Sequence, residues 1–371
     1  MEEPRKIVLI LGNGFDLDLG LKTSYKDFWE SDFCPKDYPA PLIHHLNQRW
    51  PDNLKAVKWY DMENELLAYY YNSVQSGKRE DVISKSERKF LEIIKPELWH
   101  YGIYKDYIKE ANSLYEKGYL TFESGLLRRM EIPYKDDLLE SSIWRDRKAL
   151  ELIKEGLCKY LKSIEQPIFK NNSTAYHLLL ALQKVAEAGD FISIFTFNYT
   201  RVQMRGSSMD GIPVYYMHGN CENGRIIIGT RDDLKVEKEY DFLQKAMDDS
   251  FTPPDIITPL KEADEVIIFG HSLGENDRQY FAPFFLRQAD YDNPERKDIT
   301  IFTRDDNSKF EIKRALQKMT DGKLSALFSI NQPNIIRTAN LQDDQNLMFK
   351  FLVNHHTDEQ FASEIVGKLL Q

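Results

Sequence analysis

Short apolar runs rich in branched residues recur along this chain, and each ends at or just before a glycine, asparagine, histidine or arginine. In the first, at residues 6–11, every side chain after Lys6 is aliphatic. A continuous apolar run of this length is typical of a strand that is buried on both faces of a sheet. Five more runs of the same kind span residues 191–197, 213–217, 225–229, 265–270 and 298–303.

Helical patterns lie between the apolar runs. A serine at position 173 can cap a helix that Gly189 ends just before the second run. A further helix is expected at residues 277–287, where three phenylalanines share one face. Strands that alternate with helices form parallel β-α units, so we expect a Rossmann-like α/β fold with a parallel sheet flanked by helices.

Residues 35–166 have a different character. They are rich in Tyr, Trp, Lys and Glu at helical spacing and contain no convincing buried strand. We therefore expect a helical insertion domain at 35–166 and a discontinuous α/β nucleotide-binding core made of residues 1–34 and 167–371. The stretch at 235–255 and the tail beyond Asp305 are polar and carry no clear pattern.

The composition is that of a globular protein, with 42% hydrophobic and 29% charged residues in a chain of 371. No stretch approaches the roughly 20 apolar residues that span a bilayer, and the first apolar run begins too early for a signal peptide. These features predict a cytoplasmic protein without membrane partners. The net charge of −10 repels a phosphate backbone, so broad nucleic-acid binding is not expected.

The cysteines and histidines do not form a metal-binding pattern. Cys34, Cys158 and Cys221 are far apart in the sequence, and no two histidines stand at i, i+4 spacing with a carboxylate between them. We therefore predict that folding and ligand binding need no metal ion. The cysteines are expected to be reduced thiols.

The first apolar run leads directly into the glycine loop Gly12-Asn13-Gly14. Glycines at this point allow a sharp turn and bring backbone N–H groups close to a phosphate. The third glycine of the dinucleotide-binding fingerprint is missing, because position 17 is leucine. A simple strand-to-helix turn is the alternative. Asp16 and Lys22, two charged residues in the same glycine-bounded stretch, are candidates for contact with a bound nucleotide.

Polar side chains follow two further apolar runs. Thr196 and Asn198 stand at the end of the second run, and His218 directly follows the third. The carboxyl ends of parallel strands meet at one edge of a sheet, where ligands bind. We therefore expect these side chains to face the crevice beside the glycine loop, where a histidine can act in acid–base chemistry. The alternatives are an asparagine that caps a loop and a histidine in a structural hydrogen bond.

A fourth polar loop follows the run at 265–270. Gly270 and Ser272, with the backbone amides around them, could hold a ribose or an adenine edge. Asp277 stands at the start of the following helix, where the helix dipole alone is an alternative explanation for a carboxylate. The role of His271 in this loop stays open.

The segments described so far occur in an order that resembles a known family. G-N-G-F-D at 12–16 and G-L-K-T at 20–23 are followed by W-Y-D-M-E at 59–63, F-N-Y-T at 197–200, H-G-N at 218–220 and G-H-S-L-G at 270–274. This order resembles the AbiH family of bacterial abortive-infection proteins, which is similar to the sirtuin-like NAD-binding superfamily. The resemblance covers most of the core and enters residues 35–166 only through W-Y-D-M-E.

The resemblance implies a sirtuin-type fold with NAD as substrate or ligand. It makes Gly12 and Gly14 positions of the phosphate loop, Asn198 the neighbour of the nicotinamide ribose, and His218 the general base. Phe197 and Thr200 replace the glutamine and aspartate of the sirtuin pattern, and the zinc-binding cysteines of the deacetylases are absent. The implied function is a phage-defence effector that hydrolyses NAD to nicotinamide and ADP-ribose, rather than a zinc-dependent deacetylase.

The insertion is expected to form a lid over the crevice and to bring Asp61 or Glu63 to it. A carboxylate at that position can stabilise a cation-like ribose. The alternative for both is a solvated helix face. Two other functions stay open: a non-catalytic sensor of NAD or ADP-ribose, and a nuclease or nucleotide hydrolase on the same frame. The expected partners are a nucleotide ligand and either a second copy of the chain or another defence protein.

Overall fold

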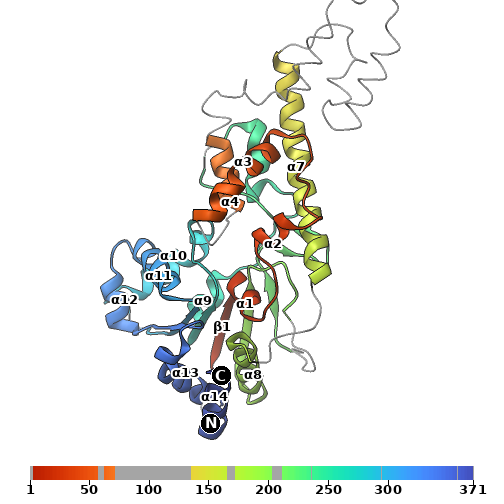
Figure 1. The fold of residues 1–371 in the computed structure, drawn as a ribbon. Coiled ribbons are helices and arrows are strands. Elements are labelled where there is room, and N and C mark those ends of the chain that lie inside the picture. Colours follow the sequence, from red (N-terminus) through yellow and green to blue (C-terminus); the bar gives the residue numbers. More distant parts are fainter. Residues whose placement is uncertain are drawn as a thin grey trace, which may run out of the picture. The chain divides into compact units, whose positions relative to one another are not determined.

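The chain forms two compact units, each built from separate stretches of sequence (Figure 1). The computed structural model describes residues 3–56, 62–71, 135–164, 172–202, 211–234, 236–293, 295–356 and 358–370. The sheet unit consists of Met1–Ser24, Leu161–Ile226 and Ser250–Gln371. The helical unit consists of Tyr25–Tyr160 and Ile227–Asp249.

The sheet unit contains a six-stranded parallel sheet in the order β3-β2-β1-β6-β7-β8. The strands are β1 (Lys6–Leu11), β2 (Phe191–Thr196), β3 (Val214–Tyr216), β6 (Glu265–Phe269), β7 (Asp298–Thr303) and β8 (Asn334–Arg337). The predicted α/β class with a parallel, helix-flanked sheet is therefore confirmed. The chain proceeds from β1 toward one edge of the sheet and from β6 toward the other, so the strand order reverses between these two strands. In open α/β sheets, ligands bind beside such a reversal.

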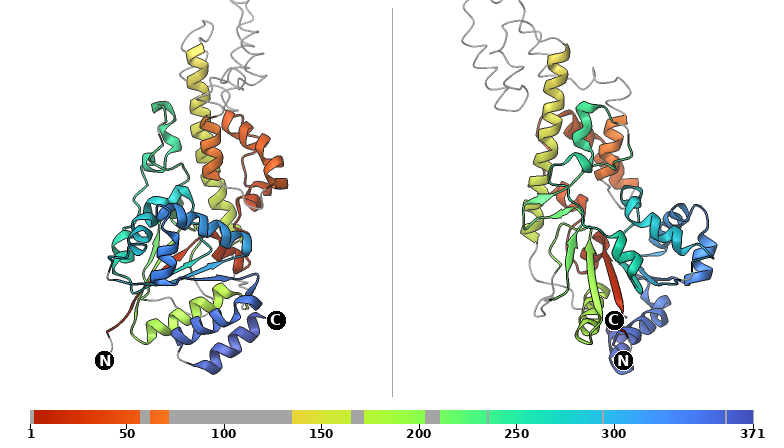
Figure 2. Two further views of the ribbon diagram at one scale, coloured as in Figure 1. Left: turned by 90° about the vertical axis from the view of Figure 1, so that its left-hand side faces the viewer. Right: turned by 180° about the vertical axis from the view of Figure 1, so that it is seen from behind.

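Helices cover both faces of the sheet, and strand β1 shows why. Its side chains alternate between the faces, as the two-residue repeat of a strand requires. Ile7, Leu9 and Leu11 pack on one face with α8 (Thr174–Glu187), α13 (Leu341–His356) and α14 (Glu359–Leu369). Figure 2 shows these three helices side by side.

The opposite face of β1 presents Val8 and Ile10. These side chains join a second apolar cluster with residues of the helices α9 (Ile257–Glu262), α10 (Arg278–Gln288), α11 (Asp306–Met319) and α12 (Leu324–Asn331). The continuous apolar run of β1 is explained by this double burial.

The predicted helices between the strands are present. Ser173 caps α8 and accepts a hydrogen bond from the Tyr176 backbone nitrogen at 3.1 Å. Gly189, which follows the helix, has a φ of +113° that few other residues adopt. Helix α10 begins one residue after its predicted start, behind a 3₁₀ turn at Glu275–Asp277. Its three phenylalanines, at 281, 284 and 285, are buried.

One strand prediction is wrong, and one strand was not predicted. The run at 225–229 does not enter the parallel sheet: only Arg225–Ile226 (β5) is a strand, and it pairs antiparallel with Gly219–Asn220 (β4). The connection after β3 is too short for a parallel crossover, which needs a dozen residues or more. Strand β8 was not predicted, because its four residues are too few for a recognisable pattern in a polar tail.

The helical unit contains α2 (Tyr25–Glu30), α3 (Pro41–Ala56), α4 (Met62–Tyr69) and most of α7 (Lys135–Ile164). Two 3₁₀ turns, η4 (Lys238–Leu243) and η5 (Lys245–Met247), belong to the same unit. Asp146 of α7 is fully buried and accepts hydrogen bonds from the Leu42 backbone nitrogen and the Tyr69 hydroxyl. This one carboxylate therefore ties α7 to α3 and α4.

The chain passes from the sheet unit to the helical unit at positions 24/25 and returns at 160/161. Residues 227–249 also belong to the helical unit. Lys154 of α7 holds this last segment through an ion pair with Asp248, with Nζ and Oδ2 2.7 Å apart. The ranges expected from the sequence, 1–34 with 167–371 and 35–166, rest on composition and remain predictions. Within the described part of the chain, no helix has both the length and the apolar character needed to cross a membrane.

Candidate functional site

Four loops of the sheet unit leave the carboxyl ends of β1, β2, β3 and β6, the strands on either side of the reversal point. They carry the glycine loop, the segment around Asn198, His218, and the segment from Gly270 to Asp277. The described contacts join all four loops into one polar cluster, which is the candidate site.

The glycine loop is pressed against the loop that follows β6. A Cβ atom at Gly12 would lie 2.5 Å from the Cα of His271, and one at Gly14 would lie 2.6 Å from the Cα of Gly270. Gly270 itself has a φ of +65°, and a Cβ there would lie 2.4 Å from the Phe15 nitrogen. Since backbone atoms cannot yield as a flexible side chain can, all three positions exclude any larger residue.

Two amide groups of the glycine loop are already hydrogen-bonded. The Gly12 nitrogen donates to the Phe269 carbonyl at 2.9 Å, and the Gly14 nitrogen donates to the Gly270 carbonyl at 3.0 Å. These amides hold the two loops together, which is the role expected if the glycine loop is a simple strand-to-helix turn. A phosphate at this edge would therefore be bound by other groups. Asn13, whose Oδ1 accepts from Thr23 at 2.6 Å, and the exposed Lys22 lie on the same stretch.

Asp16 is buried on the short helix α1 (Asn13–Asp18) that follows the glycine loop. Its Oδ2 accepts a hydrogen bond from the Thr200 hydroxyl at 2.6 Å. The pair links α1 to the segment after β2. The sequence indicated Asp16 only as a charged residue without a packing explanation, and it held no signal for Thr200 as its partner.

Asn198 fastens the end of β2 to the glycine loop. Its side-chain Nδ2 donates to the Gly12 carbonyl at 3.1 Å, and its backbone nitrogen donates to the Thr196 hydroxyl oxygen at 3.1 Å. Both residues are buried, Thr196 completely. Thr196 therefore acts on the site through the backbone of Asn198 and has no surface of its own for a ligand.

His218 and His271 bracket the carboxylate of Asp277. The Nε2 of His218 lies 3.3 Å from Oδ1, and the Nε2 of His271 lies 3.4 Å from Oδ2. Both imidazoles are buried, and Asp277 is partly exposed. A carboxylate between two imidazoles fixes the orientation of each ring and stabilises either one when it gains a proton. His271, whose role the sequence left open, thus joins the site through the loop after β6.

The ring of Phe197 forms an apolar wall against both imidazoles. Its centroid lies 4.4 Å from that of His271 and 5.3 Å from that of His218, and the His218 ring is perpendicular to it. Apolar packing on this side limits the rotamers of the two histidines. The remaining predicted residue of the fourth loop, Ser272, is exposed.

Of the two carboxylates predicted for the insertion, the structure describes Glu63, which lies in the helical unit. Glu63 forms an ion pair with the buried Lys245, with Oε1 and Nζ 2.8 Å apart. Asp61 falls outside the described residues. The lid prediction for these two residues remains a prediction.

The three cysteines are buried and are not joined in disulfides. Burial raises the pKa of the Cys34 thiol to about 12, so it stays protonated and is a poor nucleophile. Over the residues that the structure describes, no group of three or more His, Cys, Asp or Glu side chains could hold a metal ion.

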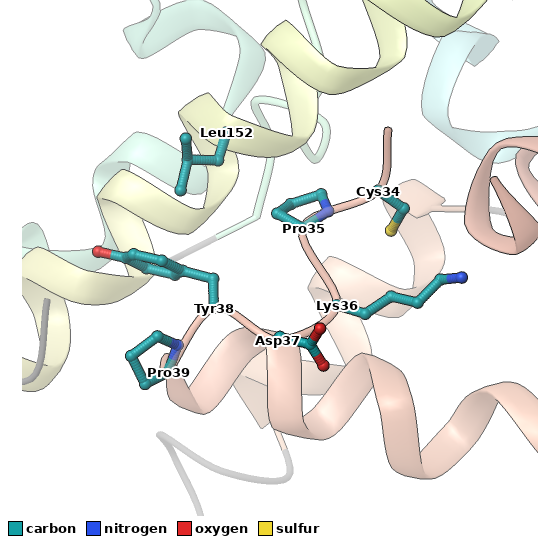
Figure 3. Close-up of a pocket in the computed structure, with 7 residues that line it drawn as sticks. All are labelled: Cys34, Pro35, Lys36, Asp37, Tyr38, Pro39 and Leu152. Atoms are coloured by element: carbon teal, nitrogen blue, oxygen red, sulfur yellow. The ribbon is translucent and has the colours of Figure 1, made fainter. Parts of the chain in front are cut away.

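A hollow of about 470 Å³ lies in the helical unit (Figure 3). Its lining consists of Cys34, Pro35, Lys36, Asp37, Tyr38, Pro39 and Leu152. The wall comes from one loop and a single residue of α7, and the only thiol in it is the protonated Cys34. This hollow therefore offers no acid–base pair comparable to the cluster around Asp277.

One family model matches a part of the chain that contains the whole candidate site. A family model described as "Bacteriophage abortive infection AbiH" matches residues 8–290, which include every residue of the candidate site. No curated protein and no solved structure matches the chain.

Proposed function

The chain belongs to the AbiH family of bacteriophage abortive infection proteins, and from that premise we propose that it is an effector that hydrolyses NAD to nicotinamide and ADP-ribose. The observation that carries this proposal is the contact between His218 and Asp277 at the carboxyl edge of the sheet, beside the strand reversal. A histidine oriented by a carboxylate is a common general base of hydrolytic enzymes.

The reaction needs a water molecule activated at the ribose. The bond between the ribose C1′ and the nicotinamide nitrogen breaks, and its electron pair leaves with nicotinamide. The water oxygen bonds to C1′ as His218 takes a proton. Because Nε2 faces Asp277, the proton would arrive at Nδ1. The carboxylate then stabilises the imidazolium that forms.

Asn198 would position the substrate. Its Nδ2 is held by the Gly12 carbonyl, so the amide plane is fixed and Oδ1 is presented in a constant direction. A fixed acceptor of this kind orients a ribose hydroxyl or the attacking water, and orientation of reacting groups contributes strongly to rate. The diphosphate would be met by the exposed side chains of Lys22 and Ser272 and by Asn13, since the Gly12 and Gly14 amides are engaged.

The test is the release of nicotinamide from NAD by the purified full chain. His218→Gln and Asp277→Asn should each lower turnover by about 10²–10⁴-fold, the range typical of general acid–base catalysis. The matched control is His44→Gln, an exposed histidine of the helical unit that contacts Gln48. It should behave as wild type, and thermal unfolding should show all three variants to be folded.

Other outcomes are informative. Full turnover by folded His218→Gln would remove His218 from the mechanism. Binding of NAD or ADP-ribose without turnover would indicate the sensor function. Cleavage of RNA, DNA or ATP in parallel incubations, with and without a divalent metal, would indicate the nuclease or nucleotide hydrolase function.

A further inference from the structure

His271 occupies an unusually constrained position in the loop after β6. Its Nδ1 accepts a hydrogen bond from the Leu273 backbone nitrogen at 3.0 Å. A ring nitrogen that accepts a hydrogen bond carries no proton, so the neutral imidazole holds its proton on Nε2. That Nε2 lies 3.4 Å from Oδ2 of Asp277.

Two features fix this arrangement. Leu273 has a φ of +53°, in the left-handed region that strains a bulky residue, and its side chain is buried. The strained turn brings its amide to the imidazole only two residues away. Such strain persists where the surrounding structure imposes it, and it is frequent at functional sites.

The glycine loop supplies the second constraint. Gly12 leaves room for the Cα of His271, and Gly14 leaves room for Gly270. The hydrogen bonds from both glycine amides then clamp the backbone just before His271. The backbone, the ring face and the tautomer of His271 are thus each fixed by a separate contact.

We propose that His271 is a positioning residue: its Nε2–H holds the Asp277 carboxylate in the orientation in which Oδ1 faces the imidazole of His218. The inference rests on the proposed NAD cleavage for its kinetic consequence, but the geometry can be tested without turnover. Oδ2 is held by His271, so Oδ1 remains directed at His218. If that donor is lost, the carboxylate can rotate away from the general base.

The kinetic experiment compares His271→Leu, which removes both ring nitrogens, with His271→Gln, whose amide can still donate to Asp277. Leucine should lower kcat by about 10–100-fold, since a displacement of about 1 Å in a catalytic group has effects of that size. KM for NAD should change less than about twofold, and glutamine should restore part of kcat. The acid limb of the pH–rate profile should move to lower pH in His271→Leu, because a carboxylate that has rotated away from His218 stabilises its imidazolium less.

An unchanged kcat in folded His271→Leu would overturn the proposal, whether or not KM for NAD changes. His44→Gln again serves as the control. Equal loss in the leucine and glutamine variants would also count against a role for the Nε2–H donor.

A second measurement separates this inference from the proposed function. Long-range ¹H–¹⁵N spectra of protein labelled at histidine report the tautomer of each ring without any substrate. We expect His271 as the Nε2–H tautomer, and we expect the His218 signals to shift in His271→Leu but not in His44→Gln. A predominant Nδ1–H tautomer at His271, or unmoved His218 signals, would refute the proposal. The expected spectra without NAD cleavage would refute the proposed function alone.

Discussion

His177 is a buried residue of α8 whose ring sits in an unfavourable environment. Within the described part of the structure, neither of its ring nitrogens has a hydrogen-bond partner. Burial, with a smaller effect from Lys368, lowers the pKa of His177 below its ordinary value of 6.5. The folded state therefore resists a proton that the unfolded state accepts. His177 therefore lowers the free energy of unfolding as the pH falls through the pKa that this histidine has in the unfolded chain.

We expect His177→Leu to raise the free energy of unfolding at pH 7 by about 1 kcal/mol, because it removes unsatisfied polar atoms from the apolar core. We also expect a shallower fall in stability between pH 7 and pH 5 than in wild type. Thermal or urea unfolding over this pH range measures both effects. The exposed His44→Gln should follow the wild-type curve, and a leucine variant as acid-sensitive as wild type would contradict the prediction.

The sequence pointed to most residues of the candidate site, but it did not indicate which of them contact one another. A position at a strand end is a local property, so Asn198, His218 and Gly270 could be selected from short segments. The pairing of Asp16 with Thr200 or of His271 with Asp277 depends on loop conformation and, for Asp16, on a contact between residues 184 positions apart in the sequence. Hydrophobic periodicity contains no information on either.

At the scale of elements, β8 and α13 are joined by one charged cluster. Arg337 at the end of β8 donates from its backbone nitrogen and Nε to Oδ2 of Asp344, both at 2.8 Å, and a third bond reaches Oδ1 at 2.9 Å. Asp306 of α11 also accepts from Arg337. The hydrogen bonds from Arg337 lower the pKa of Asp344 below its ordinary value.

Asp344→Asn should lower the free energy of unfolding by about 2–3 kcal/mol at pH 7, the range for hydrogen bonds to charged groups. The stabilisation by Asp344 is present above its unfolded pKa of about 4 and is lost as the pH falls through the lower folded pKa. The difference between variant and wild type should therefore narrow below about pH 4. Chemical denaturation at pH 7 and pH 3 gives both values.

Asp343→Asn is the matched control for this prediction. Asp343 is the preceding residue, is exposed, and lies 3.5 Å from the same guanidinium. Exposed ion pairs contribute little, so a change below about 0.5 kcal/mol is expected. Equal effects of the two substitutions would show that the hydrogen bonds of Asp344 do not stabilise the junction.

The elements beyond Asp305 were not predicted, because this part of the sequence is rich in polar residues. Asp305 caps α11 by accepting from the Ser308 nitrogen, and Asp358 caps α14 in the same way through Gln360 and Phe361. Both caps are visible in the sequence. The helices that follow are strongly polar on their outer faces, and the strand between them is only four residues long, so composition obscured the pattern.

At the scale of the whole molecule, the sheet consists of two halves that meet at β1 and β6. The fold class followed from the buried strands alone, because apolar runs separated by helices admit few other arrangements. The close contact between the glycine loop and the loop after β6 could not be predicted, because a glycine in a sequence does not show which segment of the backbone packs against it.

Gly270→Ala should therefore destabilise the sheet unit strongly, by about 2–4 kcal/mol, through left-handed backbone strain together with overpacking. Gly322→Ala provides the comparison, because Gly322 also has a positive φ, +84°, but has nothing within 4 Å of an added Cβ. We expect about 1 kcal/mol there, from strain alone. Urea unfolding of both variants measures the difference, and equal losses would exclude the contact between loops as the cause.

The central position of β1 also determines when the site can exist during synthesis. Of the six strands in the sheet, the central strand β1 is synthesised first, and its partners are residues 191–196 and 265–269. At roughly 5–20 residues per second, it waits on the order of ten seconds or more for the second partner. His271 and Asp277 follow directly after that partner. A nascent chain that ends before Asp277 therefore lacks the centre that we propose for catalysis.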